Sequence, residues 1–295
     1  MNSSAEVGPN LFIAGVSRAG TTSLHYMISS HEEVSAGLHK ELWVYNVDNR
    51  YPNREEIFLS EFQEPKTTTY RLDSTPHYFD SRLFWDARPG LASRSSEKSV
   101  FQLILRDSPN ARFIVSLRHP VARFVSEYLM NRAKEKPFVA KTLLEHIEGC
   151  LERRVPPNAD YFLMGSYGSM TLEAFRVAKQ EQFLFLLQED WVIDNSKTVQ
   201  TCFEFLGLEE PELGVNSESR NSGNKYFREG IEAIAPRNAS RNTIITSIEK
   251  LAKAFAAEMS LFSESSGTDI TTWNRWDPTQ YAMKLIERAQ QGPKL

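Results

Sequence analysis

Residues 11–24 read LFIAGVSRAGTTSL, and this segment limits the possible folds more than any other part of the sequence. Leu11 to Ala14 are apolar and predict a short buried strand, while Thr22 to Ser30 predict the following helix. The turn between them, Ser17 to Thr21, directs main-chain N–H groups toward whatever lies beyond the helix N-terminus. The segment therefore predicts a strand, a tight turn and a helix that together bind an anion.

The spacing of the glycines in this turn separates it from a nucleoside-triphosphate P-loop. Gly15 and Gly20 have the P-loop separation, but Thr21 stands where the P-loop lysine belongs, and the cation is Arg18. Such a turn suits a nucleotide with a single 5′-phosphate group, with hydroxyl donors from Thr21, Thr22 and Ser23. The alternative is a turn that only caps the helix and binds nothing.

A second strand–helix junction has the same character. Residues 113–117 predict a buried strand, Arg118 follows at its carboxyl end, and Pro120 fits the first turn of the next helix. Arg118 and Ser126, two turns into that helix, are expected to converge on a second anion. Two anion sites at strand ends suit a ligand with phosphate groups at both ends, and nucleotides bind at that edge of open α/β sheets.

These two segments resemble the 5′- and 3′-phosphate-binding motifs of sulfotransferases that use 3′-phosphoadenylyl sulfate (PAPS). Further stretches are similar to the heparan-sulfate-type branch and its bacterial relatives, in the same order along the chain, and together they cover roughly residues 10–230. They are His39-Lys40-Glu41-Leu42-Trp43, Asp73-Ser74-Thr75-Pro76-His77-Tyr78-Phe79, Phe183 to Asp190 with Phe203 to Leu208, and Asn221 to Arg228.

The resemblance implies a set of site residues. Glu41 is implied as the general base for the acceptor, with Lys40 and Arg18 as cations near the reacting group; His77 and His39 are rival bases because histidine titrates near neutrality. No metal is implied. The implied contacts to PAPS, and to the product adenosine 3′,5′-bisphosphate, are Arg18, Ala19, Gly20, Thr21, Thr22, Ser23, Arg118, Ser126, Asn221, Ser222, Lys225 and Arg228.

Two positions depart from the family pattern. The family often has lysine where this chain has Arg18, and the heparan-sulfate branch usually has lysine where this chain has Ser74. Arginine donates hydrogen bonds in a planar fork and does not deprotonate. Because the charge on the acceptor side differs at Ser74, a glycosaminoglycan acceptor is not carried over.

The composition limits the kinds of molecule that this protein is expected to bind. The net charge is −4 and the sequence pI is near 6.0, which argues against a nucleic-acid or polyanion surface. Two cysteines, Cys150 and Cys202, do not make a disulfide framework, and Cys202 falls on an apolar helical stripe. The sequence shows no signal peptide and no membrane span, so we expect a cytoplasmic enzyme that acts on a small-molecule acceptor.

The order of the predicted elements indicates an α/β fold, with a P-loop-like parallel sheet flanked by helices on both faces. Residues 1–295 are expected to form one domain, with an α/β core at 10–230 and a C-terminal helical extension at 231–295. Residues 47–66 are expected to be a surface insertion, and 209–241 a lid. Strands are predicted at 11–16, 34–37, 68–73, 112–117 and 182–187, with helices at 22–30, 98–106, 120–132, 141–153, 170–179, 196–206, 244–255 and 278–290.

Three functions remain open at this point. The first is a PAPS-dependent sulfotransferase that acts on a hydroxyl or amine, such as that of a specialised metabolite or alkaloid. The second is a small-molecule or nucleoside kinase, which the displaced cation of the turn disfavours. The third is a nucleotide-binding protein without activity.

Overall fold

The computed structural model describes residues 8–47, 49–62, 68–80, 99–156, 159–209, 234–235 and 239–291. They form two compact units. The first contains the described residues up to Arg118 and those from Leu172 to Glu209; the second contains His119 to Thr171 and the described residues from Ile234 onward. The single-domain organisation expected from the sequence stays a prediction.

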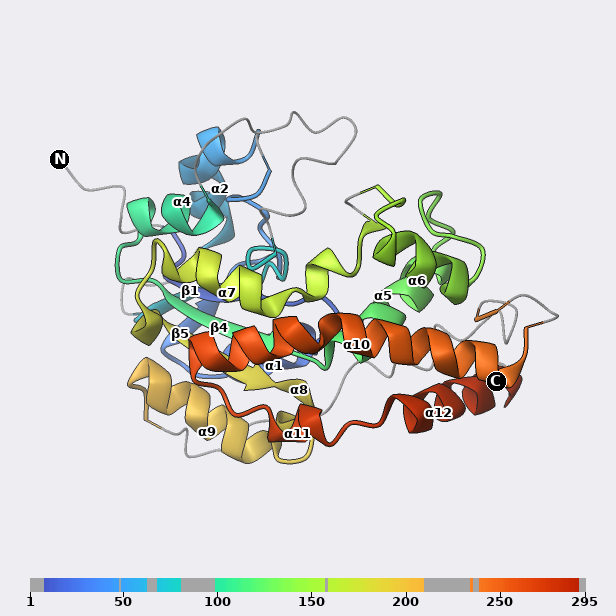
Figure 1. Ribbon diagram of the computed structural model, residues 1–295. Helices are drawn as coiled ribbons and strands as arrows, with labels where there is room; N and C mark the ends of the chain where they lie inside the picture. The colour runs from blue at the N-terminus through green and yellow to red at the C-terminus, as the bar shows by residue number, and fades with distance from the viewer. Residues whose placement is uncertain are drawn as a thin grey trace. The chain divides into compact units, whose positions relative to one another are not determined.

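The first unit is built on one parallel sheet of five strands (Figure 1). All five fall where the sequence predicts them, and β1, β4 and β5 are short runs rich in apolar, β-branched or aromatic residues. The order β2-β3-β1-β4-β5 places β1 next to both β3 and β4, so the chain fills one side of β1 before crossing to the other. The strands are β1 (Leu11–Gly15), β2 (Val34–Ala36), β3 (Tyr70–Asp73), β4 (Arg112–Leu117) and β5 (Phe183–Leu187).

Aliphatic side chains cover one face of this sheet. Leu11, Ile13 and Ile114 project to the same side and pack in one cluster with side chains of helices α1 (Thr21–Ile28) and α9 (Asn195–Leu206). The cluster also contains Trp191, from the short helix α8 (Gln188–Trp191). Cys202 is fully buried here as a free thiol, as its place on the apolar stripe predicts.

Aromatic rings fill the opposite face. Phe12, Phe113 and Phe183 stack across three strands, with ring centroids 5.5 and 4.8 Å apart. Phe101 of helix α4 (Val100–Asp107) meets Phe113 edge-on at 5.1 Å, and Phe175, at the end of helix α7 (Tyr167–Phe175), meets Phe183 at 5.5 Å. Apolar side chains on both faces are what a parallel sheet requires, and the predicted α/β class is confirmed.

The expected surface insertion at 47–66 is corrected in part. The 3₁₀ turn η2 (Tyr51–Asn53) leads into helix α2 (Arg54–Glu61), which the sequence analysis did not predict. The helix is mostly polar, yet Phe58 is buried and its ring lies 6.1 Å from that of Tyr45. A single buried aromatic anchor gives too weak a periodicity to detect from sequence.

The second unit is helical. It contains helices α5 (Pro120–Ala133), α6 (Leu143–Leu151) and the first half of α7, with the 3₁₀ turn η4 (Leu163–Gly165) between α6 and α7. The two predicted C-terminal helices are present as α10 (Arg241–Ser266), which is longer than expected, and α12 (Pro278–Gln291). The short α11 (Thr271–Asn274) between them was not predicted. Helix α10 packs against α5, α6 and α12 (Figure 1).

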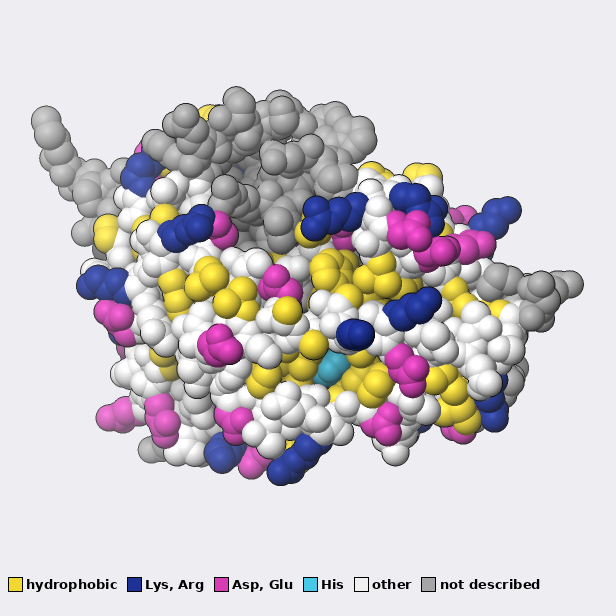
Figure 2. Space-filling model, viewed as in Figure 1, with side chains coloured by type: hydrophobic (Ala, Val, Ile, Leu, Met, Phe, Trp, Pro, Cys, Tyr) yellow, Lys and Arg dark blue, Asp and Glu magenta, His cyan; other side chains and the backbone are white. Residues whose placement is uncertain are grey.

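Charges of both signs are interspersed over the face shown in Figure 2, as expected for a net charge of −4. Within the described part of the chain, no helix is both long and apolar enough to cross a membrane.

Candidate functional site

Four of the predicted site segments in the first unit lie at one edge of the sheet. Arg18 follows β1, the Lys40–Glu41 pair follows β2, His77 follows β3, and Arg118 follows β4. The four strands are neighbours and parallel, so their carboxyl ends meet at the same edge. The strand order reverses direction between β1 and β4, and α/β sheets bind ligands at such points.

The turn after β1 has the backbone conformation of an anion site. Arg18 and Gly20 adopt left-handed φ angles of 72° and 80°. The N–H of Ala19 donates to the carbonyl of Val16 at 3.2 Å, which closes the turn. The N–H of Leu24 donates to the Gly20 carbonyl at 3.2 Å, whereas the first N–H groups of a helix have no intrahelical acceptor. The turn therefore presents donors at the N-terminus of α1.

Neighbouring elements hold this turn in place. The hydroxyl of Ser116, on β4, donates to the Ala19 carbonyl at 2.6 Å, and the indole N–H of Trp191 donates to the same hydroxyl at 3.0 Å. Trp191 also covers Gly20. The sequence analysis missed both residues, because they lie about 100 and 170 positions from the turn and carry no local signal.

Arg118 lies against the turn itself. Its Nη1 donates to the carbonyl of Arg18 at 3.4 Å, so the two arginines of neighbouring strand ends are brought together. Ser126 lies on α5, in the second unit, and is half-buried. Its convergence with Arg118 on one phosphate group stays a prediction. Arg123, one turn before Ser126, is buried and donates to the Tyr161 carbonyl, so it serves the core of the second unit.

Lys40 and Glu41 form an ion pair after β2. The Lys40 Nζ lies 2.7 Å from Glu41 Oε1 and donates to the carbonyl of Ser74 at 3.2 Å. The Lys40 side chain is 19% exposed and that of Glu41 33%, so both groups reach solvent from a partly desolvated position. A carboxylate paired with one cation in this way can accept a proton from an acceptor that approaches through the exposed side.

The segment after β3 fixes the backbone around this pair. The N–H of Leu42 donates to Asp73 Oδ1 at 3.2 Å, and the N–H of Val44 donates to the Tyr78 hydroxyl at 3.1 Å. Asp73 in turn accepts from the hydroxyls of Thr75 and Tyr78, each at 2.7 Å. Burial raises the pKa of Asp73 to about 6, against the lowering effect of these hydrogen bonds. The resemblance did not mark Asp73 as functional; its part here is to hold residues 42–44.

The two rival histidines differ in their surroundings. His77 Nδ1 lies 3.0 Å from Oδ2 of Asp80, which is almost fully buried, and its ring lies 5.3 Å from that of Trp43. His39 is exposed, and its Nδ1 lies 2.8 Å from Glu61 Oε1. Each histidine therefore has a carboxylate that orients its ring. His77 is shielded from solvent and His39 is not, so His77 is the stronger rival to Glu41.

Several expected site residues lie outside the described residues. They are Asn221, Ser222, Lys225 and Arg228.

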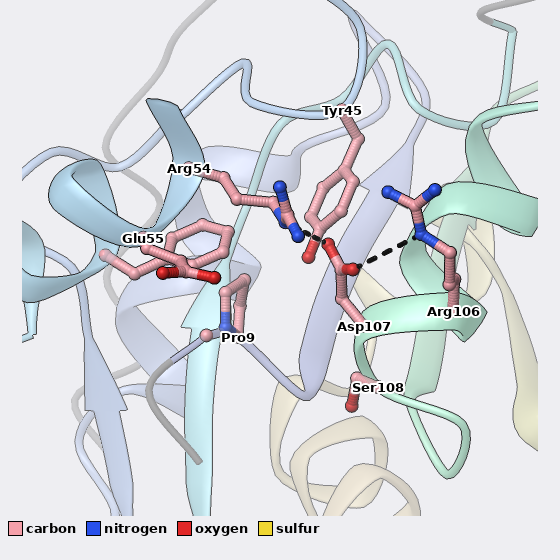
Figure 3. Close-up of a pocket in the computed structure, with 9 residues that line it drawn as sticks. Pro9, Tyr45, Arg54, Glu55, Arg106, Asp107 and Ser108 are labelled. Carbon is pink, nitrogen blue, oxygen red and sulfur yellow. Dashed lines mark ion pairs between the residues drawn. The ribbon is translucent and has the colours of Figure 1, made fainter. Parts of the chain in front are cut away.

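A separate pocket opens at the amino edge of the sheet (Figure 3). Arg54 and Arg106 flank Asp107, and Arg54 Nε lies 2.8 Å from Asp107 Oδ2. The Tyr45 side chain extends toward this ion pair, with its ring across the pocket (Figure 3). Because Pro9 and Ser108 in its lining precede β1 and β4, this pocket lies at the opposite edge from the Arg18 turn.

Comparison with known proteins agrees with the fold and shows the family. A model of the sulfotransferase family matches residues 9–212. The membrane-associated sulfotransferase kil1 of Dictyostelium discoideum is 27% identical over 123 residues, 41% of this chain and 22% of that protein. The bifunctional heparan sulfate N-deacetylase/N-sulfotransferase 1 of Xenopus laevis is 26% identical over 146 residues, 47% of this chain and 15% of that protein.

The chain belongs to the sulfotransferase family, since the family model spans more than half of it. A crystal structure of a sulfotransferase from Alicyclobacillus acidocaldarius has the same fold, with a TM-score of 0.67 at 18% identity over 91% of this chain and 99% of the other. The matched regions cover less than a quarter of the length of either curated relative, so the activities of those whole proteins are not transferred.

Proposed function

We propose that the protein transfers the sulfuryl group of PAPS to a hydroxyl or amine of a small molecule. The observation that carries this proposal is the meeting, at one sheet edge, of an anion-binding turn with a lysine–carboxylate pair. When bound, PAPS supplies an activated sulfuryl group and leaves as adenosine 3′,5′-bisphosphate. The remaining steps belong to residues of this chain.

The turn after β1 fits the 5′ end of such a co-substrate. Gly20 has a left-handed φ and lies directly beneath Trp191, so a β-carbon there is excluded. The phosphosulfate would be held by main-chain donors of the turn, by the Thr21 and Thr22 hydroxyls and by the Arg18 guanidinium. Arg18 would also balance the charge on the leaving oxygen. Arg118, against the same turn, would hold the 3′-phosphate.

Lys40 and Glu41 would serve the acceptor end. Glu41 would accept the proton of the attacking hydroxyl or amine, and Lys40, 2.7 Å from its carboxylate, would stabilise charge that develops during in-line transfer. Positioning supplies most of the catalysis in such group transfers. The segment 40–44 is well suited to it, because Asp73 and Tyr78 tie its backbone to the strand next to β1.

The alternatives are a kinase and a nucleotide-binding protein without activity. A kinase of the P-loop type needs a lysine after the second glycine and a magnesium ion, and Thr21 occupies that position here. The Lys40–Glu41 ion pair disfavours a purely binding role, because binding nucleotide alone does not require it. For the acceptor, we favour a small uncharged or cationic molecule, since the Lys40–Glu41 pair has no net charge.

The test combines binding with turnover. Isothermal calorimetry in EDTA should show binding of adenosine 3′,5′-bisphosphate without metal, and ATP with magnesium should bind weakly. The protein is then incubated with ³⁵S-labelled PAPS and a panel of a phenol, an aliphatic alcohol and a primary amine, followed by a metabolite extract. Transfer of label to any acceptor, absent in Arg18→Ala, supports the proposal. Metal-dependent ATP binding would favour the kinase, and nucleotide binding without transfer would favour the inactive protein.

A further inference from the structure

We propose that His25 is a positioning residue, which acts through Ser74 to hold Lys40 beside Glu41. The proposal rests on the proposed function for its consequence in catalysis, and on the contacts of His25 for its structural part. No motif marks His25, which lies one turn into the helix that begins at the anion-binding turn.

The contacts form a short chain of hydrogen bonds. His25 Nδ1 lies 2.8 Å from the hydroxyl of Ser74. The main chain of Ser74 holds Lys40 twice: its N–H donates to the Lys40 carbonyl at 3.0 Å, and its carbonyl accepts from the Lys40 ammonium at 3.2 Å. Lys40 then contacts Glu41 at 2.7 Å. Displacement of Ser74 would therefore move both the backbone and the charged end of Lys40.

Burial restricts the movement of the residues in this series of hydrogen bonds. Ser74 is fully buried and His25 is 5% exposed. Burial, with a smaller contribution from the Lys40 charge, lowers the pKa of His25 to about 4, so its ring is neutral at physiological pH. A neutral ring beside a buried hydroxyl can share one hydrogen bond at no cost in buried charge, and leaving either partner unsatisfied is expensive.

The path also joins the two ends of the candidate site. Helix α1 begins at Thr21, in the turn proposed to bind the 5′ phosphosulfate, and His25 is four residues later on the same helix. Lys40 and Glu41 come from the loop after β2, two strands away from β1. Through His25 and Ser74, one rigid helix sets the position of the cation–base pair relative to the turn.

The experiment compares His25→Ala, Ser74→Ala, their double variant and His25→Asn, whose amide can replace the ring Nδ1. The matched control is His31→Ala, which removes a histidine of similar burial that bonds to Glu33 and Glu209 instead. Three properties are measured: kcat with ³⁵S-PAPS, the Kd for adenosine 3′,5′-bisphosphate by calorimetry, and the rate of Lys40 acetylation by acetic anhydride, read by mass spectrometry.

We expect His25→Ala and Ser74→Ala each to lower kcat about tenfold or more, the scale of a misplaced catalytic group, with Kd within twofold. The double variant should be no worse than the poorer single variant, because both act on one path. Lys40 should acetylate several-fold faster in these variants, and His25→Asn should recover most of the loss. His31→Ala should change neither kcat nor labelling.

Unchanged Lys40 labelling in folded His25→Ala, or kcat within twofold of wild type, would overturn the proposal. An equal loss in the His31→Ala control would also overturn it, because the effect would then be general destabilisation. If the wild-type protein transfers no sulfuryl group to any acceptor, the proposed function fails, while the acetylation rates still decide the role of His25.

Discussion

Trp191 lies so close over Gly20 that a β-carbon added to the glycine would fall 2.3 Å from Cζ2 of the indole. The indole is itself fixed by its hydrogen bond to Ser116, which also holds the Ala19 carbonyl. The indole has no room to withdraw without breaking that bond. Gly20 is therefore required twice, by its left-handed φ and by the ring above it.

The first prediction follows from this contact. Gly20→Ala should abolish nucleotide binding and lower the free energy of unfolding by more than the ~1–2 kcal/mol that a left-handed β-carbon alone costs. Gly207→Ala is the matched control, since Gly207 also has a left-handed φ, 70°, but nothing lies within 4 Å of an added β-carbon. Urea denaturation and calorimetry with adenosine 3′,5′-bisphosphate measure both effects. Equal stability losses in the two variants would show that the Trp191 contact is unimportant.

Arg118 is predicted to distinguish nucleotides by their 3′-phosphate. Arg118→Ala should weaken binding of adenosine 3′,5′-bisphosphate by about 1.5–3 kcal/mol, the range for hydrogen bonds to charged groups. Binding of 5′-AMP, which lacks that phosphate, should barely change. An equal loss for both nucleotides by calorimetry would mean that Arg118 acts through its bond to the Arg18 carbonyl and supports the turn instead.

The identity of the base is tested by Glu41→Gln. The amide keeps the shape and a hydrogen bond to Lys40 but cannot take a proton, so kcat should fall by about 10²–10⁴ while nucleotide affinity stays near wild type. Glu61→Gln is the control, a carboxylate that holds exposed His39. If Glu41→Gln keeps near-normal turnover and His77→Ala abolishes it, the base is His77, oriented by Asp80.

The pH dependence of stability gives a fourth prediction, in the second unit. His146 is fully buried between aromatic rings, and burial lowers its pKa from 6.5 to about 4, against the raising effect of the Ala159 carbonyl. The unfolded chain therefore takes up this proton near pH 6.5, whereas the native state resists it until about pH 4. Stability is lost as the pH falls through that window, by up to ~3 kcal/mol for this group.

His146→Leu should remove that slope. The difference in unfolding free energy between variant and wild type, measured by urea denaturation at pH 7, 5.5 and 4.5, should shift in favour of the variant as the pH falls. His25 acts in the same direction in both proteins, while the raised pKa of Asp73 acts in the opposite direction, and both cancel in the difference. A constant difference across the three pH values contradicts the assignment.

The fold was predictable because its determinants are local. Phe113 to Leu117 and Phe183 to Leu187 are apolar runs of strand length, which predict strands. The turn that contains Gly20 can be recognised from its small and hydroxyl-bearing residues. Helix α2 was not predicted because a single buried aromatic residue, Phe58, does not create a helical periodicity in the sequence.

The supports of the site were not predictable in the same way. Trp191, Asp73 and His25 act on residues far from them in sequence, so no local spacing links them to their partners. A buried aspartate or histidine in a sequence looks the same whether it holds a functional loop or only a core. Their roles appear only when the partner atoms are placed in space.

The hydrogen bonds of the Ser116 hydroxyl mean that the turn after β1 depends on parts of the protein distant in sequence. It donates to the Ala19 carbonyl and accepts from the Trp191 indole, so the turn after β1 is completed by groups from β4 and α8. A peptide of residues 9–31 contains the whole strand–turn–helix motif but lacks both the Ser116 hydroxyl and the Trp191 indole. If this segment is grafted into another sheet, we therefore expect it to bind no nucleotide, because the turn depends on residues along the whole edge of this sheet.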